Sequence, residues 1–322
     1  MLPTKPPHNR LGSEPTLVET LVIGAGAIGS FVAARLHRAG NEVTLLARGR
    51  RLDQLRREGL RIASASGFET VQIPALEWDQ LEGWPRQSII CTKTCDLPHV
   101  LDRLRILPGA SGRIVTLQNG VEAPDQAARS LSDSTILAGR VHGFFELREG
   151  TVRHVGVDPD ILLGRTAGPD ERAVDQVVQQ LKAAGIASAV AQDIRVELWR
   201  KLLLAASLGG VASYLRIPAG SVMLSPCSAA MLRRAMAEVS ALARVSGIDL
   251  PSDCVDRTLI FTAKFPPDAT TSLQRDLMAG RTSEYDALVG AVVRLARSRN
   301  VPVPTFLEID RALFSAGFGN RT

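Results

Sequence analysis

The chain has 322 residues, of which 45% are apolar, so it is long enough for about two domains with substantial cores. The net charge is +5, but 38 basic and 33 acidic residues are interspersed and only 4% of residues are aromatic, which argues against a nucleic-acid surface. The basic excess favours an anionic small molecule as the partner.

Residues 1–17 carry prolines and charges but no continuous apolar core like that of a signal peptide. No later stretch is long and apolar enough to cross a bilayer. We therefore expect a flexible leader on a cytoplasmic protein without a membrane partner. Too few cysteines are present for a disulfide framework, and CTKTC lacks the second pair or histidine of a zinc site, so we expect no metal but buried, unreactive thiols. The cysteines are Cys91, Cys95, Cys227 and Cys254.

From Thr20 the pattern predicts a strand (TLVIGAG), a tight turn, a helix (AIGSFVAARLHRAG) and a second strand (NEVTLLAR). The turn contains a G-x-G-x-x-G motif, whose glycines in this setting permit the turn, the approach of a pyrophosphate and close packing of helix on strand. This predicts dinucleotide binding at the helix N-terminus, and the alternative is a tight turn without a ligand. The expected cofactor contacts are Gly24, Gly26, Ala27, Ile28 and Gly29.

The second strand ends at Arg48, where NAD-specific folds usually place an acid that holds the ribose hydroxyls. A guanidinium pairs with phosphate through charged hydrogen bonds but accepts no hydroxyl proton. Arg48 therefore predicts a contact with the 2′-phosphate of NADP. Arg56 and Arg57, and also Arg50 and Arg51, fit a solvated basic start of the next helix.

Apolar runs at residues 86–93, 112–120 and 134–147 predict further parallel strands. Residues 151–165 predict a hairpin whose turn is the Asp-Pro-Asp at 158–160, and residues 170–185 predict a helix. Two of the strands lead to polar residues at the carboxyl edge of the sheet, where ligands bind in such folds. These residues are Lys93 and Asn119, for which a solvated lysine and an Asn-Gly turn are the simpler interpretations.

Beyond Asp193 long amphipathic stretches replace the strand pattern, at residues 193–208, 225–247, 270–298 and 304–316. The predicted fold class is therefore α/β, with an N-terminal Rossmann-type parallel-sheet domain at residues 18–192. A mostly helical domain, expected to bind the substrate and carry the catalytic residues, follows at residues 193–322.

Lys201 lies inside an otherwise apolar helical stretch, LWRKLL. It either extends to solvent or points into a site where it protonates a carbonyl. Ser272 precedes Glu284 by twelve residues, and Glu284 lies in GRTSEYD before a strongly apolar helix. Most such glutamates are surface charges, and a catalytic role is the alternative.

The motifs GAGAIG, the arginine of VTLLAR, TKT, LQNG, LWRKLL and GRTSEYD, in this order between Thr20 and Pro304, resemble those of the ketopantoate reductase (2-dehydropantoate 2-reductase) family. The resemblance implies NADPH-dependent reduction of a 2-oxo acid. It also implies the residue roles: Lys201 as general acid, Ser272 and Glu284 at the substrate, Asn119 beside nicotinamide and substrate, and Lys93 with Arg48 at the 2′-phosphate.

The chain departs from the family at Ala205, Gly209 and near Ala219, where asparagines are usual. We expect Ala205 and Gly209 to leave a larger, less polar space, so that bulkier, more apolar 2-oxo acids are better substrates than ketopantoate. The alternatives are a related two-domain 3-hydroxyacid-type dehydrogenase and a non-catalytic NADP-binding sensor. The oligomeric state is open, with a homodimer as one candidate.

Overall fold

The structure is a computed structural model that describes residues 18–64, 67–109 and 111–317. The expected leader at residues 1–17 lies outside this part of the chain. Within it, none of the helices combines the length and the apolar character needed to span a bilayer.

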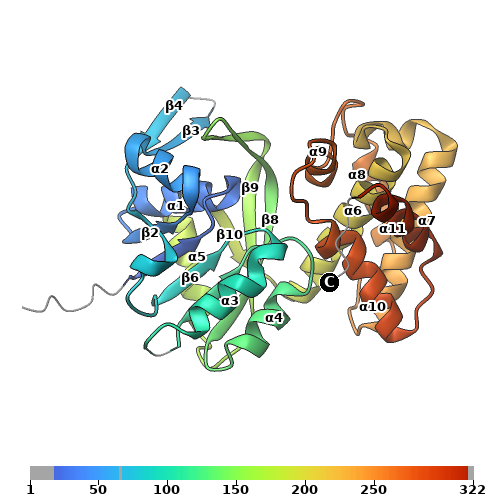
Figure 1. Cartoon of the computed structure of the whole chain (residues 1–322). Coiled ribbons are helices and arrows are strands. Elements are labelled where there is room, and N and C mark those ends of the chain that lie inside the picture. The colour runs from blue at the N-terminus through green and yellow to red at the C-terminus, as the bar shows by residue number, and fades with distance from the viewer. Residues whose placement is uncertain (1–17, 65–66, 110, 318–322) are drawn as a thin grey trace, which may run out of the picture.

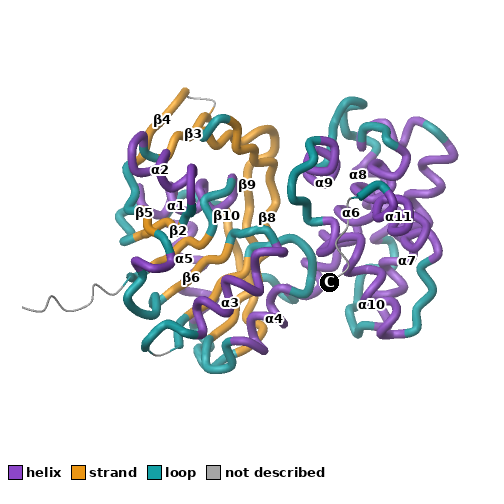
Figure 2. The backbone as a smooth tube through the Cα atoms, in the orientation of Figure 1, coloured by secondary structure: helices purple, strands orange, loops and turns teal. Residues whose placement is uncertain are grey.

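The predicted strand–helix–strand unit is present as β1 (Thr20–Ile23), α1 (Ala27–Arg38) and β2 (Val43–Leu46), and β1 pairs with β2 in parallel. On its other side β1 pairs in parallel with β6 (Gln87–Ile90), which pairs in parallel with β7 (Arg113–Thr116). The α/β prediction is therefore confirmed. All these strands end at one edge of the sheet, so the segments that follow them lie side by side (Figure 2).

The sheet is buried on both faces, which explains why apolar residues of its central strands face both sides. Side chains alternate between the faces, so Leu21 and Ile23 belong to one core cluster while Val22 belongs to the other. The cluster that contains Val22 includes residues of α1, α2 (Gly49–Glu58) and α5 (Ala173–Ala183), and the other includes residues of α3 (Leu97–Arg105) and α4 (Ala123–Ser130).

A long antiparallel pair, β8 (Thr135–Arg148) and β9 (Thr151–Ala167), extends the sheet beyond β7. The predicted turn at residues 158–160 is wrong, because these residues lie within β9 beside an irregularity in its pairing. The actual turn is Glu149-Gly150, with φ of 49° and 75°. Two successive residues at positive φ suit the twist of a two-residue hairpin.

Further strands at the two edges of the sheet were not predicted from the sequence. The strand order is β4-β3-β9-β8-β7-β6-β1-β2-β5, and β10 also pairs with β9. The added strands are β3 (Leu60–Ser64), β4 (Gly67–Val71), β5 (Ala75–Leu76) and β10 (Ala187–Val190).

The helical part lies beside the sheet (Figure 1) and is built around α6 (Ile194–Leu215). This helix packs against α7 (Pro226–Val245), α9 (Ser272–Met278) and α11 (Pro304–Ser315). The expected stretch 270–298 is not one helix, since α9 ends before Gly280, whose φ is 60°. A loop at residues 279–284 follows, and it carries Glu284 to the sheet. The other α-helices of this part are α8 (Cys254–Thr262) and α10 (Ala291–Arg299).

The cysteine prediction is wrong in part. Cys254 is buried, and burial raises the pKa of the Cys91 thiol to about 12, so both fit unreactive thiols. Cys95 and Cys227 are exposed, because Cys95 lies in a short turn at the sheet edge and Cys227 in the first turn of α7.

Candidate active site

The glycine-rich loop after β1 is shaped by its close neighbours. Gly24 has φ 105°, and a Cβ on it would lie 2.9 Å from Thr92 Cγ2, whereas a Cβ on Gly29 would lie 2.0 Å from the Gly24 carbonyl oxygen. Gly26 is exposed, and an added Cβ there would meet no atom within 4 Å. The helix that follows begins with no side-chain cap and no acidic residue in its first turn. The loop therefore fits a dinucleotide phosphate.

Two substitutions separate the roles of these glycines. Gly29→Ala is expected to lower the free energy of unfolding by about 1–3 kcal/mol, because its methyl group overlaps backbone atoms. Gly26→Ala should unfold at nearly the parent temperature but bind NADPH less tightly, since its methyl group fills the space left for the pyrophosphate. Thermal unfolding and NADPH titration of both variants check this. Parent-like affinity in Gly26→Ala would contradict a phosphate at that position.

The arginines after β2 have different environments. Arg51 donates hydrogen bonds to the Ala25 carbonyl oxygen at 3.1 Å, to Ser30 Oγ at 3.1 Å and to the Gly150 carbonyl oxygen at 3.0 Å. Arg51 is thus a structural residue that fixes the glycine-rich loop. The interpretation as a solvated side chain is wrong for it, because the loop, α1 and the turn between β8 and β9 all supply acceptors for its guanidinium. Arg50, Arg56 and Arg57 are exposed, as expected.

Arg48 is 79% exposed, at the end of β2 where the sequence places it. Its Nη2 lies 3.2 Å from Oδ1 and 3.4 Å from Oδ2 of Asp96. Asp96 belongs to the short 3₁₀ turn η2 (Thr94–Asp96) that follows β6. The guanidinium therefore has a carboxylate partner that the sequence did not indicate.

The loop from α9 to residue 284 meets the carboxyl edge of the sheet. Lys93 Nζ lies 2.7 Å from Asp276 Oδ2 and also donates to the Thr282 carbonyl oxygen. Lys93 is therefore turned towards the helical part, where Asp276 holds it. A 2′-phosphate contact of Lys93 therefore has Asp276 as a competing anion.

Glu284 lies at the centre of these contacts. Its Oε1 accepts a hydrogen bond from Thr94 Oγ1 at 3.2 Å, and its Oε2 accepts one from Asn119 Nδ2. The backbone of residue 120 approaches the following π-helical turn η4 (Asp286–Gly290) so closely that a Cβ on Gly120 would lie 2.7 Å from the Ala287 carbonyl oxygen. The structure thus brings Asn119 and Glu284 together, and a π-helical segment beside them is typical of functional sites.

Lys201 is partly buried on α6. Burial lowers the pKa of its ammonium group to about 8, the negative charge of Glu284 opposes this shift, Arg140 lowers the pKa further and Asp160 raises it. A lysine with this pKa is mostly protonated at neutral pH and releases its proton more readily than an ordinary lysine. The charges of Lys201 and Glu284 therefore lie close enough to influence each other, which places both residues in one site.

A partly buried charged cluster near Lys201 was missed from the sequence. Arg140, with 16% of its side chain exposed, places Nη2 2.8 Å from Asp160 Oδ1, and His142 Nδ1 lies 3.1 Å from Asp160 Oδ2. Ala138 packs against α6, and Arg140 follows it on the same face of β8. The signal in the sequence was the alternation of Arg140 and His142 within an apolar run.

The structure places Ser272 on the surface, and it contradicts the space expected at Gly209. Ser272 is exposed in the first turn of α9, and among the described residues it forms no hydrogen bond with Lys201 or Glu284. Gly209 is buried, and a Cβ on it would lie 3.2 Å from Leu273 Cδ2. The space expected at Gly209 is therefore filled by Leu273, because α9 packs directly on α6. Ala205 is partly buried and apolar, as expected.

Buried polar atoms at the same edge support a ligand there. The side-chain amide of Gln118 and the hydroxyl of Thr92 have no hydrogen-bond partner among the described residues. Gln118 directly precedes Asn119, and Thr92 contacts the glycine-rich loop. Since buried polar groups are normally hydrogen-bonded, these atoms fit a site that a polar ligand completes.

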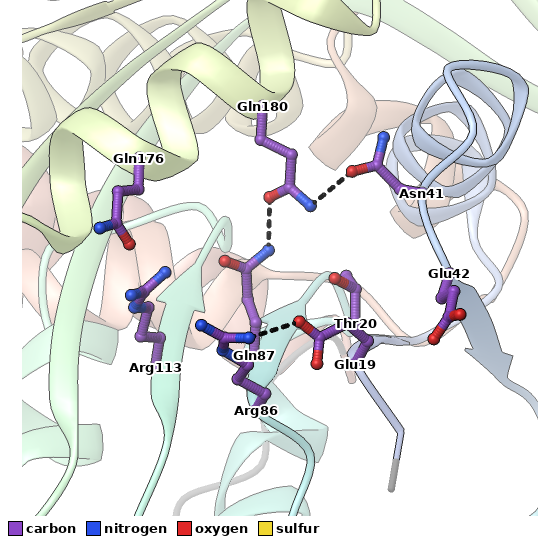
Figure 3. A pocket seen from close by; sticks show the side chains of 9 residues that line it. All are labelled: Glu19, Thr20, Asn41, Glu42, Arg86, Gln87, Arg113, Gln176 and Gln180. Atoms are coloured by element: carbon purple, nitrogen blue, oxygen red, sulfur yellow. Dashed lines mark hydrogen bonds and ion pairs between the residues drawn. The ribbon is translucent and has the colours of Figure 1, made fainter.

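A polar cavity of about 210 Å³ lies at the opposite, amino-terminal edge of the sheet (Figure 3). Its side chains bond one another: Gln87 Nε2 donates to Gln180 Oε1 at 2.8 Å, and Gln180 Nε2 donates to Asn41 Oδ1 at 3.0 Å. This chain of amides ties the sheet to α5 and to the end of α1. It lies away from the glycine-rich loop and from Lys201, so it is separate from the candidate active site.

Comparisons with known proteins place these features in a family. The family model "Ketopantoate reductase PanE/ApbA" matches residues 20–168, and the model of its C-terminal part matches residues 193–313. The chain is 27% identical to a 2-dehydropantoate 2-reductase of Halobacterium salinarum, over 89% of this chain and 95% of the relative. It is 28% identical to another from Mesorhizobium japonicum, over 88% and 93% of the two chains. A PanE/ApbA family ketopantoate reductase from Ralstonia eutropha superimposes with a TM-score of 0.82 at 28% identity, covering 92% of this chain and 97% of that one.

Proposed function

Because the chain belongs to the ketopantoate reductase family, we propose that it reduces a 2-oxo acid to the 2-hydroxy acid with NADPH, where the carboxyl edge of the sheet meets α6 and Glu284. The chain is an oxidoreductase that interconverts a carbonyl and a hydroxyl group, with a nicotinamide cofactor. The observation that carries the assignment to this site is Lys201, whose pKa of about 8 suits a proton donor, within the influence of the Glu284 carboxylate.

In this proposal residues 18–192 hold the cofactor and residues 193–322 supply the acid. The glycine-rich loop, with Ala27 and Ile28 at the start of α1, holds the pyrophosphate, and Arg48 holds the 2′-phosphate. Lys93 joins Arg48 in competition with its Asp276 partner. When bound, the reduced nicotinamide supplies the hydride that reduces the carbonyl carbon.

The proton-transfer chemistry falls to the residues around Glu284. Lys201 donates a proton to the carbonyl oxygen as negative charge develops on it. Glu284 keeps Lys201 protonated and fixes Asn119, which orients the reacting groups. Ser272, exposed at the start of α9, is proposed as a substrate contact on the family resemblance.

The test of this function is NADPH consumption with a panel of 2-oxo acids that includes ketopantoate. We expect oxidation of NADPH, with apolar branched 2-oxo acids ahead of ketopantoate in kcat/KM, because Ala205 and Leu273 offer no partner for a substrate hydroxyl. A lead of ketopantoate by about tenfold would restore it as the substrate. Binding of NADPH without oxidation would favour a sensor, and activity only with 3-hydroxyacids would favour the related dehydrogenase class.

Cofactor preference gives a second test. NADPH should bind about tenfold more tightly than NADH, because of the two cofactors only NADPH carries a 2′-phosphate that can pair with Arg48, and charged hydrogen bonds contribute about 1.5–3 kcal/mol before solvent screening. Arg48→Ala should remove the preference, while Arg56→Ala, which replaces an exposed arginine of α2, the helix that follows Arg48, should leave it intact. Titration of both cofactors checks this, and equal affinities in the parent would contradict the phosphate contact.

A further inference from the structure

The ion pair between Arg48 and Asp96 joins segments on the two sides of β1. Arg48 follows β2 and Asp96 follows β6, and β1 lies between these strands in the sheet. The pair therefore spans the carboxyl end of β1, where the glycine-rich loop begins. In a dinucleotide-binding sheet the adenosine half of the cofactor lies at this edge, between the loop and the end of the second strand.

Asp96 and a 2′-phosphate are competitors for one guanidinium. Both Asp96 oxygens lie within 3.4 Å of Arg48 Nη2, so the arginine is already neutralised before a phosphate arrives. Asp96 is 38% exposed and Arg48 is 79% exposed, so water screens their attraction. Such a pair is weak and exchangeable. The other basic residue of this segment, Lys93, is held by Asp276.

We propose that Asp96 is a determinant of cofactor selectivity: it occupies Arg48, must be displaced by the 2′-phosphate, and so limits the preference for NADPH over NADH. The inference rests on the cofactor site proposed above. NADH leaves the ion pair in place, whereas NADPH exchanges one anionic partner of Arg48 for another and brings its phosphate close to a carboxylate. The phosphate therefore adds to the binding free energy only the amount by which its attraction to Arg48 exceeds two costs: the loss of the Arg48–Asp96 pair and the repulsion between the phosphate and Asp96.

The test measures binding of nucleotide fragments, which is independent of catalysis. Asp96→Asn should bind adenosine 2′,5′-bisphosphate about three- to tenfold more tightly than the parent, as expected for removing one screened charge a few ångströms away. Binding of adenosine 5′-monophosphate should change less than about twofold, since it lacks the 2′-phosphate. Isothermal titration at fixed low ionic strength gives both affinities. The matched control is Asp102→Asn, which removes the same charge from an exposed ion pair with Arg105 on α3.

A second pair of variants separates competition from simple repulsion. On an Arg48→Ala background, Asp96→Asn should change binding of the bisphosphate by less than about twofold, because no guanidinium is left to compete for. An equal gain on both backgrounds would overturn the proposal, as would unchanged bisphosphate affinity in Asp96→Asn or an equal gain in Asp102→Asn. If the parent binds neither nucleotide, the proposed cofactor site fails together with this inference. If the parent binds both and Asp96→Asn changes neither, only the inference fails.

Discussion

Replacing Lys201 with alanine is expected to lower turnover by about 10²–10⁴-fold while NADPH binding stays within a few-fold of the parent, because a positioned acid acts on the reaction rather than on the cofactor. Single-turnover kinetics and NADPH titration measure the two effects separately. Arg195→Ala removes a cation from an exposed position on the same helix and should leave turnover unchanged. Near-parent turnover in Lys201→Ala would show that this lysine is not the acid.

The lowered pKa of Lys201 also predicts the pH dependence of the reaction. The protonated lysine is the active form for reduction, so kcat/KM should be level below about pH 8 and fall above it. Oxidation of the hydroxy acid needs the neutral lysine and should rise through the same pH. In Lys201→Ala, both the fall in the rate of reduction and the rise in the rate of oxidation near pH 8 should disappear. A profile for reduction that stays level to pH 10 would contradict a lysine with this pKa.

Replacing Glu284 is expected to have the second largest effect, a loss of turnover of about 10²-fold in Glu284→Ala, because charged hydrogen bonds contribute about 1.5–3 kcal/mol each. The Glu284 carboxylate accepts hydrogen bonds from both Thr94 and Asn119, so its removal leaves these two side chains without that partner. The informative variant is Glu284→Gln, which keeps the side-chain shape but removes the charge.

Since the charge of Glu284 raises the pKa of Lys201, Glu284→Gln should move the fall in kcat/KM to lower pH than in the parent. Asp286→Asn, two residues further on and paired with Arg294, is the matched control and should leave the pH profile in place. A merely structural role for Glu284 would lower activity without moving the profile. An unmoved profile in Glu284→Gln would therefore contradict coupling between the two residues.

Several features of this fold could be predicted because they depend on neighbours in the chain. The glycine spacing after β1 sets the turn and the start of α1, and Arg48 lies between β2 and α2, directly before the helix. The hairpin turn was misplaced because Asp-Pro-Asp is a stronger local turn signal than Glu149-Gly150, and only the pairing of β8 with β9 distinguishes them. The strands β3 and β5 pair with β9 and β2, so their place in the sheet depends on partners that are not their neighbours in the chain.

The sequence by itself determined the α/β class, the dinucleotide loop and the residue types available for catalysis, because these follow from local spacing and periodicity. Only the tertiary structure decided which of those residues meet. Glu284 contacts Asn119 and Thr94 across 165 and 190 positions of the chain, and Asp96 reaches Arg48 across 48. Leu273 fills the space beside Gly209 because α9 packs on α6. Contacts between residues so far apart depend on how whole elements pack, which no short window of sequence specifies.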